Sequence, residues 1–244
     1  IFLSALRRVR KGDVVFVVTN PPTLPFVALA VCLLKKARLE LRIEDVYPEA
    51  MIAAGMLRRH SVFHRTLDYF HRVLYKRTHA IIVLGRDMWQ LVACKVPLQQ
   101  GKITVIPNWA DLDQVAPLSR EQNPLLQRLG IASKFVVQYS GNMGRTHDLE
   151  SLLDAADHLR TYDSIHFLFI GSGAKAPLVR QTAVAKGLAN VTVLPPQPRT
   201  ELCVSLNACD IAIIAFVPGM VGVSVPSRMY NILAAGKPLL AIAG

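Results

Sequence analysis

Hydrophobic residues along the chain alternate between short continuous runs and longer stretches with helical spacing. In the first half the continuous runs are DVVFVVTNPP, LELRIED, AIIVLG and ITVIPN, at residues 13–22, 39–45, 80–85 and 103–108. Such runs are typical of strands buried on both faces of a parallel sheet. The stretches between them predict helices over about 23–36, 48–57 and 60–78, with one more before residue 103. This alternation predicts a parallel α/β domain.

The predicted helix over 60–78 has the clearest amphipathic pattern. Phe63, Leu67, Phe70 and Leu74 recur at helical spacing and are expected to face the core. His60, His64 and His71 lie near the same face and flank this stripe. No carboxylate or thiolate completes the set, so we expect solvated or basic histidines there and no metal site.

The strand pattern stops over residues 109–132, where Pro, Asn and Asp accumulate as in a linker. It then restarts with the runs KFVVQYSG, IHFLFIG, VTVLP, DIAIIAF and PLLAIAG, and helices are expected over 148–160, 174–187, 199–208 and 226–235. We therefore expect an N-terminal domain over 1–110, a linker over 111–132 and a C-terminal domain over 133–244. Each domain has fewer strands than the roughly six of a doubly wound domain, which predicts a piece of a longer protein.

Charge is unevenly distributed between the two halves. Residues 1–110 contain 17 Lys and Arg against 7 Asp and Glu, whereas the rest contains 11 against 10. A basic first half predicts an anionic partner such as lipid headgroups or a diphosphate. Nucleic acid is not expected, because aromatic residues are not interleaved with these charges. The cysteines at 32, 94, 203 and 209 lack metal or redox spacing and are expected to be buried thiols of a cytoplasmic protein.

Two glycine-containing loops follow predicted strands of the second half. In YSGNMGRTHDL, Gly141 and Gly144 let backbone N–H groups approach a ligand, Arg145 adds charge, and His147 starts a helix. This is the first βα loop of its domain, where ligands bind in such sheets, although an ordinary βα turn is the alternative. FIGSGAKA has glycines at 171 and 173 but no third glycine and no later ribose-binding acid, so it predicts a second loop lining the same crevice rather than a dinucleotide site.

The stretch GVSVPSRMYNILAAGKP, residues 222–238, predicts a helix capped by Ser224 and ended by Gly236. Ser227, Arg228 and Asn231 would cluster near its N-terminus, where an anion and hydroxyl groups can bind. An ordinary capped helix is the alternative interpretation.

Carboxylates gather in RIEDVYPEA, where Glu44, Asp45 and Glu49 lie between a strand end and a helix start. Asp45 and Glu49 are candidates for a catalytic base or for binding acceptor hydroxyls. Alternatively, either residue caps the helix that begins at Pro48.

Taken in order, the stretches TNPP, DVYPEAMIAAGM, VIPNWADLD, YSGNMGR, FIGSG and VPSRMYNILAAGKP resemble glycosyltransferase family 4, and within it the lipopolysaccharide and colanic-acid type. The resemblance implies a GT-B fold, with two Rossmann-like α/β domains facing a cleft. The C-terminal domain would bind a nucleotide-sugar donor, with a UDP-sugar expected, and the N-terminal domain an acceptor. It also implies a retaining reaction without a metal or another cofactor.

By this resemblance, Gly141, Asn142, Gly144, Arg145 and Arg228 would face the donor diphosphate. Ser227 and Asn231 would face phosphate or ribose, and Gly171 and Gly173 would line the nucleotide side. The sequence departs from the family at Asn231, where a Glu is usual, and at His147, which stands near the place of a lysine. His147 is expected to substitute for that lysine only when protonated.

The resemblance implies an enzyme that builds a bacterial surface polysaccharide on a glycan or lipid-linked acceptor, in the cytoplasm and at the anionic inner face of the membrane. The chain itself is expected to be feeble or inactive, because catalytic elements would lie beyond both ends. A nucleotide-sugar 2-epimerase of the same fold is the enzymatic alternative. A degenerate sugar-nucleotide binder is the non-enzymatic one, since Asn231 cannot supply charge.

Overall fold

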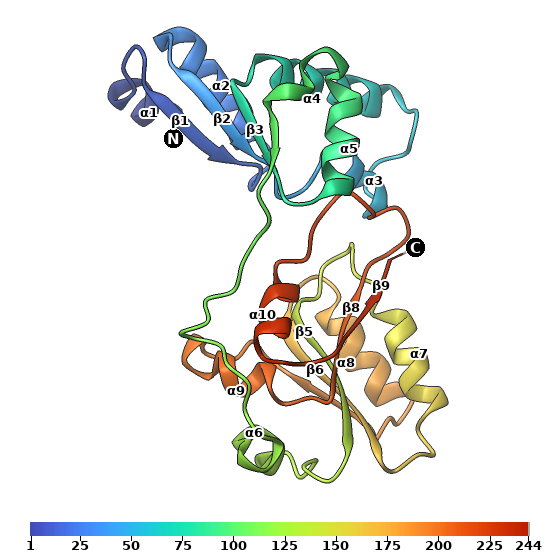
Figure 1. The fold of residues 1–244 in the computed structure, drawn as a ribbon. Helices are drawn as coiled ribbons and strands as arrows, with labels where there is room; N and C mark the ends of the chain where they lie inside the picture. Colours follow the sequence, from blue (N-terminus) through green and yellow to red (C-terminus); the bar gives the residue numbers. More distant parts are fainter. Residues whose placement is uncertain (244) are drawn as a thin grey trace. The chain divides into compact units, whose positions relative to one another are not determined.

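The computed structural model describes residues 1–243, which form two compact units (Figure 1). The first unit contains residues 1–108 and 218–225, and the second contains residues 109–217 and 226–243. Each unit has its own parallel sheet with helices between successive strands. The α/β class predicted from the hydrophobic pattern is therefore confirmed.

The first unit has a four-stranded sheet in the order β1-β2-β3-β4. Its strands are β1 (Val14–Val18), β2 (Arg38–Arg42), β3 (Ala80–Val83) and β4 (Ile103–Val105). Its helices are α1 (Phe2–Arg8), α2 (Leu24–Lys35), α3 (Glu49–Ala53), α4 (Val62–Arg77) and α5 (Arg86–Lys95), with a 3₁₀ turn η1 (Pro97–Lys102). These strands and the helices after β1 fall within the segments expected from the sequence, except that β2 begins one residue earlier, at Arg38.

Strand order determines which face of this sheet is covered. Consecutive strands are neighbours, and right-handed crossovers between them place their helices on one face. Leu41 and Ile81 are fully buried on that face, whereas Val14 and Phe16 of β1 are each 54% exposed. The expectation that the first strand is buried on both faces is therefore wrong, because Val14 and Phe16 lie on the face opposite to these helices.

Helix α4 buries a different face from the one its sequence pattern predicted. His71, Leu74 and Tyr75 are buried, but Phe63 and Phe70 are 58% and 51% exposed. His71 is a core residue rather than a solvated one: its ring packs edge-on to Phe26, and its Nδ1 lies 2.8 Å from the carbonyl oxygen of Leu67. Burial lowers the pKa of His71. The predicted stripe is thus wrong for its two phenylalanines.

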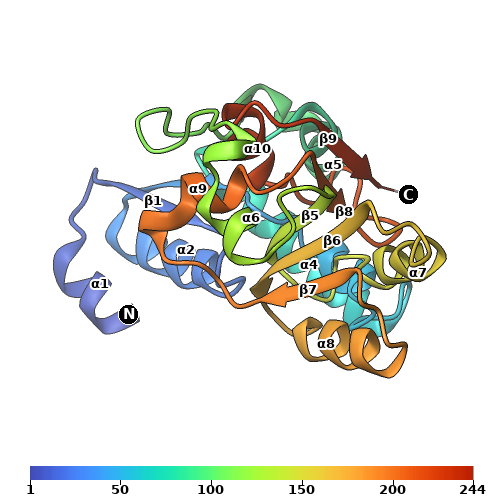
Figure 2. The ribbon, with the colours of Figure 1, turned by 90° about the horizontal axis from the view of Figure 1, so that it is seen from below.

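The second unit has a five-stranded sheet in the order β7-β6-β5-β8-β9. Its strands are β5 (Phe135–Asn142), β6 (Ile165–Ser172), β7 (Val191–Leu194), β8 (Ile211–Ala215) and β9 (Leu239–Ile242). Its helices are α6 (Pro124–Arg128), α7 (Glu150–His158), α8 (Ala176–Ala185), α9 (Leu202–Leu206) and α10 (Arg228–Ala234), with 3₁₀ turns η2 (Arg120–Gln122) and η3 (Arg199–Glu201). Figures 1 and 2 show α7 and α8 on one side of the sheet and α9 and α10 on the other.

The segment 111–132, expected to be a linker, is folded onto the second unit. Arg120 Nη1 donates to both carboxylate oxygens of Asp210, at 2.5 and 2.6 Å. The buried side chain of Asn207 bonds Leu118 N and the Ala116 carbonyl, each at 2.9 Å. The side chain of Arg120 and backbone groups of this segment therefore hold it against the second unit.

The four cysteines divide between core and surface. Cys32 and Cys209 are buried, Cys203 is half-buried, and Cys94 is exposed. The expectation of buried thiols is therefore wrong for Cys94, which lies near the C-terminal end of α5. All four are free.

Candidate functional site

The second sheet reverses its direction of growth between β5 and β8. From β5 the chain adds β6 and β7 on one side, then returns to add β8 and β9 on the other. In parallel sheets, ligands bind outside the carboxyl ends of the strands at such a reversal. The loop after β5 is held here, because the His147 ring stacks on Phe216 at 5.1 Å and the two residues form a backbone bridge.

Arg228, the first residue of α10, reaches the carboxyl end of β5 from the side of the sheet opposite to α7 and α8. Its Nη1 donates to the Ser140 carbonyl at 3.1 Å, and its guanidinium carbon lies 4.4 Å from the centroid of the Tyr139 ring. The Tyr139 hydroxyl in turn donates to the Asn142 carbonyl at 2.7 Å. Within residues 1–243, Arg228 Nη2 is buried without a hydrogen-bond partner. The site therefore holds a fixed cation with an unused donor, which suits an anionic ligand.

Two glycines make this close packing possible. Gly141 has a φ of +140°, and a Cβ there would lie 2.6 Å from Arg228 Nη1. Gly171, on the adjoining β6, has a φ of +146°, and a Cβ there would overlap the Gly141 carbonyl oxygen. Both positions are thus restricted to glycine by neighbouring protein atoms. Both glycines were selected from the sequence, but they were expected to make room for a ligand rather than for neighbouring protein atoms.

A cavity of about 310 Å³ opens beside these glycines, at the ends of β5 and β6. Its lining includes Asn142 and Ser172 together with Pro196, Gln197 and Leu202. The last three were not selected from the sequence. Gln197 is a polar residue among prolines, just after the run VTVLP, and this position could have indicated that it lines the site. Strand β7 pairs with β6, and the carboxyl ends of neighbouring parallel strands lie together.

His147 does not supply positive charge to the site at neutral pH. Burial, followed by the nearby Arg228 charge, lowers the pKa of His147 to about 4. Lys175 is the cation beside this loop: its Nζ donates to the His147 carbonyl at 2.7 Å and to Glu150 Oε2 at 2.8 Å. Sequence reasoning missed Lys175 because it follows β6, away from Gly141–Arg145 along the chain.

Helix α10 begins later than predicted. Its N-cap is Ser227, without a side-chain capping bond, whereas Ser224 forms a backbone bridge with Asp45 in the first unit. The predicted N-cap at Ser224 is therefore wrong. The predicted end is confirmed: Gly236 has a φ of +67°, and Lys237 N bonds the Ile232 carbonyl.

The remaining predicted donor-side residues lie on the same unit. Gly144 follows β5 in the loop, and Gly173 follows β6 directly. Asn142, Arg145 and Ser227 are exposed, and Asn231 is half-buried on α10. The structure thus brings Gly141, Gly171 and Arg228 into direct proximity, and it gives Ser227 and Asn231 no side-chain bond to that group within residues 1–243.

The two predicted carboxylates of the first unit have different surroundings. Glu49 Oε1 lies 2.6 Å from the buried ammonium of Lys95, while its Oε2 is buried without a partner among the described residues. Glu49 also lines a cavity of about 280 Å³ together with Arg59. Asp45 is half-buried after β2, where Val46 N bonds the Val223 carbonyl. Neither residue caps α3 through its side chain, because the N-cap is Pro48.

No protein-family model matches the chain. The chain is 34% identical over 238 residues to a probable glycosyltransferase, WbjE, of Pseudomonas aeruginosa. It is 27% identical over 241 residues to a putative colanic acid biosynthesis glycosyl transferase, WcaI, of Escherichia coli. Each alignment covers 96% of the chain and 58% of the relative. The chain thus spans little more than half the length of these relatives.

Solved structures share the fold. A structure of HepE from Anabaena in complex with UDP and glucose aligns with a TM-score of 0.78 at 15% identity, covering 98% of the chain and 62% of HepE. A sucrose-phosphate synthase from Thermosynechococcus elongatus aligns with a TM-score of 0.72 at 14% identity, covering 95% and 57%. The chain has the GT-B fold. The predicted fold class is confirmed at this level.

Proposed function

We propose that the chain is part of a glycosyltransferase that moves a sugar from a nucleotide-diphosphate donor to a surface-glycan acceptor. The observation that carries this proposal is the half-buried Arg228, fixed at the β5–β8 reversal, with its Nη2 buried and unpartnered within residues 1–243. A diphosphate oxygen satisfies such a donor and compensates the charge. The similarity to WbjE supports the same function.

The donor diphosphate would lie across the ends of β5 and α10. Arg228 would bind it from a fixed position, and the exposed Arg145 would reach it from the loop. Since Arg228 is already held by Ser140 and Tyr139, little reorganisation is needed as charge develops on the leaving diphosphate. We propose that these cations serve in place of a metal, and that the sugar is transferred with retention at its anomeric carbon.

The nucleoside would occupy the cavity of about 310 Å³ beside Gly171. Gln197 and backbone groups near Gly173 would contact the base, and Ser227 and Asn231 would bind hydroxyl or phosphate oxygens. We propose uridine as the base, with support from the HepE structure, which holds UDP. Asn231 donates and accepts hydrogen bonds but carries no charge, so it would hold the ribose less strongly than a glutamate.

The acceptor would bind to the first unit. Glu49 Oε2 and the half-buried Asp45 are available to accept hydrogen bonds from sugar hydroxyls, and Arg59 on the same cavity as Glu49 is available to a phosphate. We propose a lipid-linked acceptor at the cytoplasmic face of the membrane. The description of WcaI as a colanic acid enzyme supports a polysaccharide product.

Isothermal titration of the chain with UDP, UDP-glucose and uridine tests the donor site. We expect UDP to bind more tightly than uridine, and equal affinities would contradict the diphosphate assignment.

Transfer is then measured on the complete protein with a labelled UDP-sugar and a polyprenyl-diphosphate sugar. A longer labelled lipid product supports the proposal, whereas an epimerised sugar formed without acceptor, or binding without turnover, overturns it. The variant Asp45→Asn, assayed in parallel, should lower turnover while leaving UDP affinity unchanged.

A further inference from the structure

The outer face of α4 exposes an unusual number of large apolar side chains. Val62 is 83% exposed, Tyr69 63%, Phe63 58% and Phe70 51%. These residues form two neighbouring rows at seven-residue spacing, Val62–Tyr69 and Phe63–Phe70, and a spacing of seven returns to nearly the same side of a helix. The opposite side of α4 is already packed in the core through His71, Leu74 and Tyr75. The exposed rows are therefore not needed to hold the helix in place.

Cations continue both rows and surround them. The next residue at the same spacing is Lys76 in one row and Arg77 in the other, and Arg58 and Arg65 lie at the N-terminal end of the same segment. All four of these cations are exposed. The acid within α4, Asp68, is withdrawn from the face, because its carboxylate lies 2.6 Å from Arg72 Nε and 2.5 Å from Lys95 Nζ. The face thus combines aromatic residues with uncompensated positive charge.

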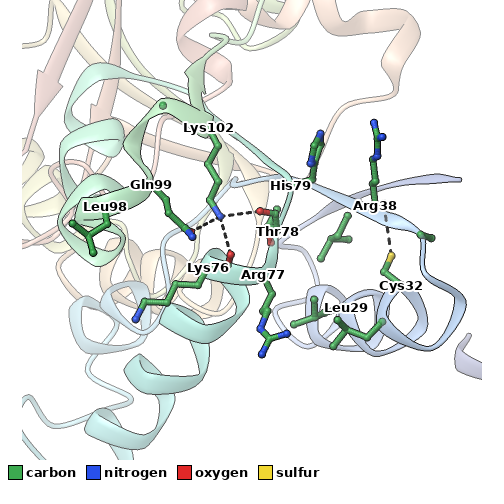
Figure 3. A pocket seen from close by; sticks show the side chains of 14 residues that line it. Leu29, Cys32, Arg38, Lys76, Arg77, Thr78, His79, Leu98, Gln99 and Lys102 are labelled. Carbon is green, nitrogen blue, oxygen red and sulfur yellow. Dashed lines mark hydrogen bonds between the residues drawn. The ribbon is translucent and has the colours of Figure 1, made fainter. Parts of the chain in front are cut away.

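The side chains of Lys76 and Arg77 are not needed to cap the C-terminal end of α4. Lys102 Nζ donates to the carbonyls of Lys76 and Thr78 at 3.0 and 2.8 Å and so caps the helix (Figure 3). In Figure 3 the side chains of Lys76 and Arg77 extend away from Lys102, at the edge of a cavity of about 670 Å³ that Arg38 also lines. The lining of this cavity contains cations and no carboxylate. It offers space for a phosphate group next to the basic end of the helix.

We infer that the outer face of α4, with the basic cavity at its C-terminal end, docks the protein on an anionic lipid surface. A helix with aromatic residues on the surface and Lys and Arg around them is typical of segments that lie in the membrane interface. Each cation near such a surface adds about 1 kcal/mol of attraction. A lipid surface is favoured over a protein partner because residues 1–110 carry 17 cations against 7 acids, which suits a uniformly negative plane.

Docking of this kind is peripheral. Among residues 1–243, no helix combines the length and the apolar character needed to cross a bilayer. Helix α4 has 16 residues, so it would lie along the surface over roughly 24 Å. Docking would bring the site to the lipid-linked acceptor, and in this respect the inference rests on the proposed function. Its test, however, requires neither donor nor transfer.

Vesicle co-sedimentation of the full chain tests the inference. The probes are vesicles of phosphatidylcholine alone and of phosphatidylcholine mixed with phosphatidylglycerol. We expect binding to the mixed vesicles only. The double variant Tyr69→Ser/Phe70→Ser should lower the partition coefficient about tenfold or more, through loss of buried apolar area. The double variant Arg58→Glu/Arg65→Glu should lower it about 25-fold or more, since two attractive charges are lost and reversed.

Matched controls lie on the second unit. Tyr162→Ser/Val184→Ser removes two exposed apolar side chains, and Arg128→Glu/Arg180→Glu reverses two exposed cations. Both should bind vesicles like the unchanged chain. Equal binding to the two vesicle types, or equal losses in test and control variants, would overturn the inference.

Two further readouts separate the possible failures. If the α4 variants change the oligomeric state in sedimentation without vesicles, the face is an interface between copies, and the lipid assignment is wrong. Circular dichroism and UDP titration of each variant confirm that the fold and the donor site persist. Loss of vesicle binding with UDP affinity retained supports the docking surface. Absent vesicle binding by the unchanged chain with UDP affinity retained overturns the docking surface alone, and absent UDP binding overturns the donor site alone.

Discussion

The guanidinium of Arg228 stacks over the ring of Tyr139, with 4.4 Å between the guanidinium carbon and the ring centroid. Because Tyr139 is only 2% exposed, this cation–π contact is shielded from water and is stronger than a surface contact. Together with the bond to the Ser140 carbonyl, it fixes the cation at the end of β5. The contact thus joins α10 to the strand after which the candidate site opens.

Replacing Arg228 should weaken diphosphate binding selectively. A hydrogen bond to a charged group contributes about 1.5–3 kcal/mol, so Arg228→Ala should raise the dissociation constant of UDP by about 12- to 150-fold. The affinity for uridine should change little, because Arg228 does not line the cavity proposed for the nucleoside. Isothermal titration with both ligands measures the difference.

The control for this prediction is Arg180→Ala, which removes an exposed cation on α8 of the same unit. It should leave both affinities unchanged. Tyr139→Phe keeps the aromatic ring and should retain most of the UDP affinity. Equal losses for UDP and uridine in Arg228→Ala would show that Arg228 does not face the diphosphate.

Gly141→Ala should displace Arg228 without removing it. The added Cβ would lie 2.6 Å from Arg228 Nη1, at a φ of +140° that side chains rarely adopt. We expect weaker UDP binding together with a lower melting temperature, measured by titration and thermal unfolding. Gly187→Ala is the matched control, since φ there is +60° and no atom lies within 4 Å of the new Cβ. It should cost about 1 kcal/mol of stability and no affinity; equal UDP affinity in the two variants would contradict the prediction.

The sequence predicted the parallel α/β architecture because that architecture depends on local patterns. Buried β-branched runs such as that of β8, and helix ends such as Gly236, are visible without knowledge of the tertiary structure. The positions of Gly141, Gly171 and Arg228 could also be selected, because the two glycines lie at strand ends and Arg228 lies near the N-terminus of a predicted helix. What they do there depends on contacts between β5, β6 and α10, which lie far apart along the chain.

Other features could not be predicted because they depend on strand order and on the neighbours of each face. Phe63 and Phe70 have the spacing of a core stripe, yet α4 turns His71 inward against Phe26. Lys175 reaches the Gly141 loop only because β6 pairs with β5. Helical periodicity identifies an amphipathic helix, but it does not identify which side is covered when both sides carry apolar residues.

Stability should fall on acidification partly through His147. The folded-state pKa of about 4 lies below the ordinary value of 6.5, so the unfolded chain binds the extra proton first. The contribution is therefore fully present above pH 6.5 and is lost as pH falls toward 4. The full shift corresponds to about 3 kcal/mol, and partial exposure of the ring reduces this to about 1–2 kcal/mol. Urea midpoints at pH 7 and 4.5 should differ less in His147→Gln than in the unchanged chain.

The control for this pH dependence is His79→Gln, at an exposed histidine of the first unit. It should show the same change of midpoint between the two pH values as the unchanged chain. The difference between the two histidine variants therefore reports on His147. An unaltered slope in His147→Gln would mean that other groups cause the acid sensitivity.

Lys95 should be far more important for stability than a similar ion pair on the surface. Its ammonium is 3% exposed and lies 2.6 Å from Glu49 Oε1 and 2.5 Å from Asp68 Oδ1, so α3, α4 and α5 meet at one buried charge. Lys95→Ala would leave Glu49 without its paired cation and Asp68 with Arg72 alone, and should destabilise the chain by about 3–5 kcal/mol in urea unfolding. Lys186 also contacts two carboxylates, those of Asp154 and Asp157, but at the surface. Lys186→Ala should therefore leave the urea midpoint nearly unchanged, because water and salt screen exposed pairs. Similar losses in the two variants would show that burial does not determine the importance of Lys95.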